Sequence, residues 1–375
     1  MFSWTRFIAV LVKEFVQMRR DRLTFAMIVG IPILQLTLFG YAINADPKAL
    51  PTVLVTADNG TFARTFVSGL VNSAYFTIVR QLPSEAEADR ALARGEAQFA
   101  VVIPPDFSRQ LERGQRPVLL VAADASDPAA TGNALAALNQ LGRQVLDRDL
   151  IGPLASLRAG PPPFELRVQR RYNPEGITQY NIVPGLLGVI LQMTMVMMTA
   201  FAMTRERERG TMENLLATPV RPIEVMAGKI VPYILVGLVQ AGIILLAARL
   251  LFDVPMLGSM LVLLLGMMVF IAALLALGFT ISTLARNQLQ AMQMTFFFFL
   301  PSLLLSGFMF PFRGMPRWAQ VIGEIFPLTH FLRLVRGVLL KGNPVIDTWP
   351  HLWPIGLFLL AAAALALLRY RETLD

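Results

Sequence analysis

The sequence predicts a polytopic α-helical membrane protein with six transmembrane helices and an α/β extracytoplasmic domain inserted between the first and the second. The 375-residue chain is 55% hydrophobic and only 15% charged, whereas soluble domains carry about 25% charged residues. Its mean hydropathy is +0.57. Long apolar runs are interrupted by few charges, and residues 190–204 carry none. Runs of about 18 or more apolar residues are typical of membrane spans.

The N-terminal segment, residues 1–22, is predicted to form a cytoplasmic amphipathic helix at the membrane interface. Its apolar residues recur at helical spacing and its basic residues lie roughly opposite, as in interfacial helices: Trp4, Ile8, Leu11, Phe15 and Met18 against Arg6, Lys13 and Arg20. A helix packed on the protein's own core is the alternative. Residues 23–44 are predicted to be the first span, and no clear A-x-A cleavage site follows them, which favours a retained anchor over a signal peptide.

Residues 45–176 are predicted to form the extracytoplasmic α/β domain. β-rich runs at 52–56, 76–79, 99–103 and 118–121 alternate with helical stretches at 61–73, 84–94 and 105–113, and a long helix is expected at 128–158. The segment is neutral, with 14 Lys and Arg against 14 Asp and Glu, and it contains no His or Cys. Its acids at turns are expected to cap helices or face solvent rather than catalyse: Asp58, Asp106, Asp124 and Asp127.

Residues 177–375 are predicted to form a five-helix transmembrane region. Spans are expected at 178–204, 229–251, 257–285, 288–311 and 350–368, with a cytoplasmic coupling loop at 205–228. The stretch 312–349 contains apolar pieces too short to span and is predicted to be re-entrant or interfacial.

Orientation follows from Lys and Arg in the short flanks of the spans. The N-terminal flank, the 205–228 loop, the turn at Arg286 and the C-terminal tail are basic and fall on one side of a six-span chain. This side is predicted to be the cytoplasm, so both termini are expected there. The stretch 312–349 opposes this orientation because it carries five basic residues on the other side: Arg313, Arg317, Arg333, Arg336 and Lys341.

Several function classes are disfavoured by composition. The chain has no cysteine and only two histidines, His330 and His351, so thiol chemistry and Cys- or His-rich metal sites are not expected. The spans hold almost no charge, which argues against an ion-coupled carrier or a voltage sensor. A G-x-x-x-x-G-K-[ST] loop is absent, so any ATPase must be another polypeptide. The net charge of +8 arises entirely outside residues 45–176, so nucleic acid is not an expected partner.

The loop sequence RERERGTMENLLATPVRP, residues 205–222, predicts a short docking helix. Gly210 can end the preceding helix, Thr211 is a candidate N-cap, and Pro219 stops the new helix. Apolar Leu215 and Leu216 then lie inside a charged rim, as in protein docking sites. A plain positive-inside loop would explain the arginines but not the glutamates.

This stretch closely resembles the cytoplasmic loop of type-2 ABC transporter permeases, and the order of elements resembles their bacterial multidrug-efflux branch. Residues 308–313 and 326–329 are similar to the segment before that family's last span. The resemblance implies a non-enzymatic transport subunit of a bacterial inner-membrane exporter, with ATP and Mg held by separate ABC ATPase subunits. It also implies that these residues couple the chain to the ATPase: Glu206, Glu208, Arg209, Gly210, Thr211, Glu213, Leu215, Leu216 and Pro219.

The cargo is expected to be a lipophilic drug or a similar amphipathic compound. The second span is rich in methionine, whose flexible thioether suits varied apolar shapes, and the candidate cavity residues are Gln192, Met195, Met198 and Phe297. Packed or lipid-facing methionine is an equal alternative. Expected partners are a second copy or a paralogue, a periplasmic adaptor and membrane lipid. A membrane-anchored sensor using residues 45–176, and a permease for a lipid or polysaccharide, are the alternative functions.

Overall fold

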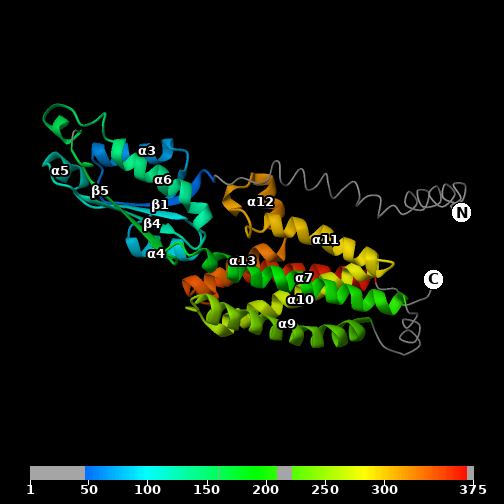
Figure 1. Ribbon diagram of the computed structural model, residues 1–375. Helices are drawn as coiled ribbons and strands as arrows, with labels where there is room; N and C mark the ends of the chain where they lie inside the picture. Colours follow the sequence, from blue (N-terminus) through cyan, green and yellow to red (C-terminus); the bar gives the residue numbers. More distant parts are fainter. Residues whose placement is uncertain (1–46, 159, 209–221, 370–375) are drawn as a thin grey trace, which may run out of the picture.

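The computed structural model describes residues 47–158, 160–208 and 222–369. An α/β domain lies at one end of a bundle of long helices (Figure 1). The predicted interfacial helix at 1–22 and the predicted first span at 23–44 lie outside the described residues.

The α/β domain contains a five-stranded mixed sheet in the order β2-β1-β3-β4-β5. All neighbouring strands are parallel except β3 and β4, which are antiparallel. The strands are β1 (Leu50–Thr56), β2 (Phe76–Gln81), β3 (Phe99–Ile103), β4 (Val118–Asp124) and β5 (Glu165–Arg171). The α-helices of the domain are α3 (Thr61–Asn72), α4 (Glu85–Ala93), α5 (Phe107–Glu112) and α6 (Pro128–Gln144).

Helices cover both faces of the sheet, because successive residues of a strand point to opposite faces and both faces carry apolar side chains. Leu54 packs in the core beneath α3, α5 and α6, whereas the adjacent Val53 packs in the smaller core beneath α4. The larger core is rich in aromatic rings, and Phe76 and Phe99 meet edge to face with centroids 5.0 Å apart. Figure 1 shows α3 and α6 on one side of the sheet and α4 on the other.

Two features of the domain differ from the sequence prediction. The expected long helix ends at Gln144, and a 3-10 segment, η2 (Gly152–Arg158), follows it. The intervening turn folds Leu146 and Leu150 back into the core, and Gly152 adopts a positive φ of 60°. Strand β5 was not predicted, because it is an edge strand that is half polar, with alternately exposed side chains.

The bundle contains five helices that are long and apolar enough to cross a membrane within the described residues. These are α7 (Thr178–Glu208), α9 (Pro222–Phe252), α10 (Met260–Leu284), α11 (Gln288–Leu305) and α14 (Val345–Arg369). Between α11 and α14 lie two shorter helices, α12 (Arg317–Gly323) and α13 (Pro327–Lys341). The chain is therefore a polytopic membrane protein with a small α/β region.

Helix α10 lies in the middle of the bundle and contacts α7, α9, α13 and α14. Small residues allow the close approach that helices need in a membrane: a Cβ on Gly278 of α10 would lie 2.6 Å from the carbonyl oxygen of Val196 in α7. Phe270 of α10 and Phe331 of α13 stack with centroids 4.0 Å apart.

Neutral polar side chains in the spans form bonds between helices. Thr194 Oγ1 of α7 donates to Gln240 Oε1 of α9 at 2.9 Å. Thr280 Oγ1 of α10 is 2.9 Å from the carbonyl oxygen of Ala362 in α14. Such bonds satisfy groups that lipid cannot, so these residues hold the bundle together.

Candidate functional site

Glu208, a residue of the predicted coupling loop, forms hydrogen bonds at the end of the bundle away from the α/β domain. Helix α7 runs past its predicted end to Glu208. The Glu208 carboxylate accepts two hydrogen bonds from Gln288, one from the backbone N–H at 2.8 Å and one from Nε2 at 2.6 Å. Gln288 is the first residue of α11, so a carboxylate from α7 caps the N-terminus of α11.

This contact also affects the charge state of the carboxylate. The side-chain and backbone N–H groups of Gln288 hold the pKa of Glu208 below its ordinary value, outweighing the small opposing effect of burial. The ionised carboxylate lies at the positive end of the α11 dipole, which favours a negative charge there.

The turn that receives Glu208 is fixed by its own side chains. Asn287 Oδ1 accepts from the Gln290 N–H at 2.8 Å, and Gln290 Oε1 accepts from the Arg286 N–H at 2.6 Å. This is a reciprocal capping arrangement at the start of α11. The Asn-x-x-Gln spacing is visible in the sequence and would have indicated the cap, but nothing local to it indicated Glu208 as its partner.

The side chain of Glu206 and the other predicted coupling residues lie outside the part of the chain that the structure describes. These other residues are Arg209, Gly210, Thr211, Glu213, Leu215, Leu216 and Pro219. Their role in coupling stays a prediction.

The four predicted cavity residues differ in burial, and their role in a cavity stays a prediction. Gln192 Oε1 accepts from Ser302 Oγ of α11 at 3.1 Å, and Met195 is fully buried in the bundle core. Met198 and Phe297 are instead 37% and 44% exposed. A cavity that includes either of these last two requires a wall from outside the described residues.

At the opposite end, the bundle contacts the α/β domain through buried polar side chains, which we call the junction. Lys341 Nζ of α13 lies 2.5 Å from Asp124 Oδ2 at the end of β4, and both side chains are more than nine-tenths buried. Lys341 also donates to the carbonyl of Leu92 at 3.2 Å, and Asn343 donates to that of Ala93 at 3.0 Å. The end of α4 is thus bonded directly to the loop after α13.

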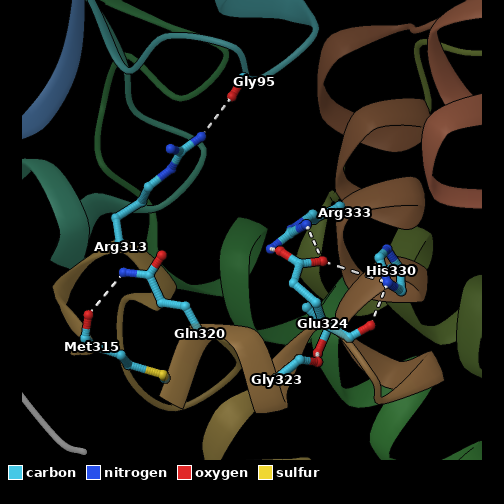
Figure 2. A network of polar contacts seen from close by, with 9 residues as sticks. Gly95, Arg313, Met315, Gln320, Gly323, Glu324, His330 and Arg333 are labelled. Carbon is cyan, nitrogen blue, oxygen red and sulfur yellow. Dashed lines mark hydrogen bonds and ion pairs between the residues drawn. The ribbon is translucent and has the colours of Figure 1, made fainter. Parts of the chain in front are cut away.

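Two arginines extend this junction across the boundary. Arg94 pairs with Asp347 at the start of α14 at 2.7 Å, and Arg313 donates to the carbonyl of Gly95 at 3.0 Å (Figure 2). Asp124 was expected to cap a turn or face solvent. Its Oδ1 does cap a turn by accepting from the Ser126 N–H at 3.1 Å, but the carboxylate is buried and its Oδ2 pairs with Lys341. Local spacing could not reveal this ion pair, because the two residues are remote in sequence.

The turn between α12 and α13 has its own polar network (Figure 2). Arg333 forms two bonds to the Glu324 carboxylate, at 3.1 and 2.7 Å. His330 Nε2 lies 2.8 Å from the carbonyl oxygen of Glu324, and Thr329 Oγ1 donates to that of Gly323 at 2.6 Å. Side chains of α13 therefore satisfy the last carbonyls of α12.

A cavity of about 380 Å³ lies between the α/β domain and the bundle at this junction. Arg94, Arg313, Arg333, Arg336 and Lys341 are among its lining residues. Four of these are the basic residues that opposed the predicted orientation. They serve the docking of the domain and the turn beside it, which positive-inside counting alone does not anticipate.

Long apolar helices joined to a docked α/β domain define a multi-pass membrane protein, and its sequence places it in a class of transport subunits. A sequence profile described as ABC-2 family transporter protein matches residues 22–368. The chain belongs to this family, which confirms the resemblance found in its loop.

Named relatives cover nearly all of the chain. The probable multidrug ABC transporter permease YbhS of Escherichia coli K12 is 31% identical over 351 residues, which are 92% of this chain and 91% of YbhS. The probable multidrug ABC transporter permease YbhR of the same organism is 29% identical and covers 92% of each chain. The inner membrane transport permease YhhJ of that strain is 31% identical over 81% of this chain and 82% of its own length. ABC-2 permeases are membrane transport subunits, not catalytic themselves, and work with ABC ATPase partners.

Proposed function

We propose that this chain is the membrane-spanning subunit of an ATP-driven exporter of lipophilic or amphipathic compounds. A separate ATPase, which holds ATP and Mg, docks on residues 205–222. The names of the relatives YbhS and YbhR support the cargo class. The absence of a phosphate-binding loop from the sequence supports a separate ATPase.

The contact between Glu208 and Gln288 carries the mechanical part of the proposal. Glu208, within the predicted loop, is the last residue of α7, and it is bonded to the start of α11. Displacement of the loop by the ATPase would therefore move the ends of α7 and α11 together. Since Gln192 of α7 also bonds Ser302 further along α11, the two helices are joined at two heights of the bundle.

The assembly that we propose is a dimer with a second copy or a paralogue. With residues 23–44 as a further span, each chain crosses the inner membrane six times and keeps both termini in the cytoplasm. The substrate path would then lie between the copies, where exposed Met198 and Phe297 would contribute. The α/β domain would face the periplasm, where it meets an adaptor or its counterpart in the dimer.

Charge reversal at the loop tests this function. In inside-out vesicles containing the transporter, Glu208→Lys and Leu215→Asp should each lower ATP-driven accumulation of a lipophilic fluorescent dye at least about tenfold. Glu208→Lys removes the acceptor for Gln288 and places a positive charge at a helix N-terminus.

The matched control is Glu112→Lys, which makes the same charge change at an exposed position on α5. It should leave accumulation unchanged. Wild-type transport by both loop variants, with the ATPase still bound, would show that the loop does not transmit the drive.

A further inference from the structure

The domain-side boundary of the membrane is marked by tryptophan. Trp318 of α12 and Trp349 and Trp353 of α14 are 42%, 58% and 52% exposed, at the end of the bundle nearest the α/β domain. Exposed tryptophan in membrane proteins concentrates at the level of the lipid headgroups. Helix α12 and the residues just after it also expose an apolar group that suits the lipid interface: Trp318, Val321, Ile322 and Ile325.

The junction cavity lies at this same level. Arg94 lines it and pairs with Asp347, two residues before Trp349. Gln320 and Glu324, in and just after α12, line it as well. A phosphate in the headgroup layer therefore lies level with the cavity, whereas an acyl chain would lie below it.

The charges that line the cavity are not fully matched. Lys341 pairs with Asp124, Arg333 with Glu324, and Arg94 with Asp347. Glu96, the remaining lining glutamate, pairs with Arg80. Among the described residues this leaves two guanidinium groups, Arg313 and Arg336, and one carboxyl group, Asp127. Asp127 attracts Arg336 electrostatically without forming a close ion pair with it and accepts from Asn181, whereas Arg313 donates to the carbonyl of Gly95. The surplus is positive.

Arg336 carries the strongest indication of a missing ligand. Its Nη1 donates to the carbonyl of Gly307 at 3.3 Å, a long bond. Its Nε and Nη2 are buried and have no acceptor among the residues that the structure describes. Unpaired buried donors on a charged group are costly, and nearly all such groups in native proteins have an acceptor.

We propose that this cavity binds a phosphate group, presented by the headgroup of a phospholipid in the domain-side leaflet. Arg336 and Arg313 supply the N–H donors, since the planar guanidinium matches phosphate geometry. Rotation of the Arg336 guanidinium presents its two orphaned N–H groups to the phosphate. Phe312 and Leu332 give the cavity an apolar side for the glycerol backbone. A lipid bound here would contact both the α/β domain and the helix bundle. Its binding would not require the ATPase.

The test measures binding to the full-length chain in a neutral detergent by native mass spectrometry. The probes are short-chain phosphatidylglycerol, inorganic phosphate and short-chain diacylglycerol, which has no phosphate. Wild type should retain phosphatidylglycerol, and Arg336→Gln should bind it at least about tenfold more weakly because the charge-assisted bonds are lost. The matched control, Arg167→Gln, neutralises an exposed arginine on β5 that pairs with Glu165 and should bind like wild type.

Each outcome decides the matter. Binding of inorganic phosphate with the same dependence on Arg336 would support the site and identify free phosphate as its ligand. Equal binding of diacylglycerol and phosphatidylglycerol, or unchanged binding by Arg336→Gln, would overturn it. If Arg336→Gln does not fold, Arg313→Gln takes its place in the same comparison, and no loss of binding there would also overturn the proposal.

Discussion

At the scale of single residues, the ion pair between Lys341 and Asp124 shows how remote parts of the chain are joined. Both charges are almost fully removed from water, and the cost of that removal offsets most of their attraction. The pair therefore adds little net stability, yet loss of one member leaves an uncompensated buried charge. Its main effect is to fix where β4 of the domain meets α13 of the bundle.

Lys341→Met is expected to destabilise the protein by about 3 kcal/mol because Asp124 is left buried and charged. The double variant Lys341→Met with Asp124→Leu should recover most of this loss, since an apolar pair has no charge to desolvate. Equilibrium unfolding in mixed micelles measures both values.

The control for this cycle is the exposed pair Arg80–Glu96, with side chains 55% and 44% exposed. Arg80→Met should cost less than about 1 kcal/mol, as for other surface pairs. Equal losses for Lys341→Met and Arg80→Met would contradict a buried role for Lys341.

At the scale of elements, hydropathy predicted which segments form long helices because a bilayer needs about 20 apolar residues to be crossed. Helix ends were less predictable. The expected span 288–311 ends as a helix at Leu305, where Ser306 and a positive-φ Gly307 begin the turn towards α12. The predicted start at 350 falls inside α14, which begins at Val345 despite Pro350 and Pro354.

The candidate site was only partly predictable, for a physical reason. The family resemblance of the charged block predicts a coupling role for Glu208, but its contact with Gln288, which belongs to a different turn, could not be predicted. Gln192 and Met195 were expected to face a cavity, and both are buried in packing within the chain. Composition shows that a span is rich in methionine, whereas only the arrangement of neighbouring helices decides which side chains remain open.

Close contact between α7 and α10 leads to a prediction for Gly278. In Gly278→Ala the new Cβ would lie 2.6 Å from the Val196 carbonyl oxygen, so the helices must separate, at a cost of about 1–3 kcal/mol. Gly242→Ala on α9 is the matched control, because no atom lies within 4 Å of its added Cβ.

Thermal unfolding in detergent should show a lower midpoint for Gly278→Ala and an unchanged or higher one for Gly242→Ala, since alanine favours helix over glycine. Similar midpoints for the two variants would mean that α7 and α10 do not pack as closely as described.

At the scale of the whole molecule, successive long helices run in opposite directions. The turns that connect them therefore lie alternately at the two ends of the bundle. The α/β domain and the α12–α13 turn lie at one end, and the α10–α11 turn lies at the other (Figure 1). Arg286, in that second turn, is exposed. The positive-inside tendency then favours the cytoplasm for the end that bears the 205–222 loop.

Because the chain contains no cysteine, single introduced thiols can report this orientation directly. Asp147→Cys, in the domain, should react with a membrane-impermeant maleimide on intact spheroplasts. Arg286→Cys should react only after the membrane is permeabilised. The reverse pattern would place the α/β domain in the cytoplasm and exclude ATPase docking at the 205–222 loop.

The central claim is that a separate ATPase drives this chain through the 205–222 loop. Its most direct test is ATP hydrolysis by the complex purified through this chain and reconstituted in lipid. Wild type should hydrolyse ATP and should be stimulated by a lipophilic transport substrate. Leu215→Asp should lose the ATPase subunit and the activity together while the permease stays folded. An unchanged, substrate-stimulated ATPase activity in Leu215→Asp would contradict the account.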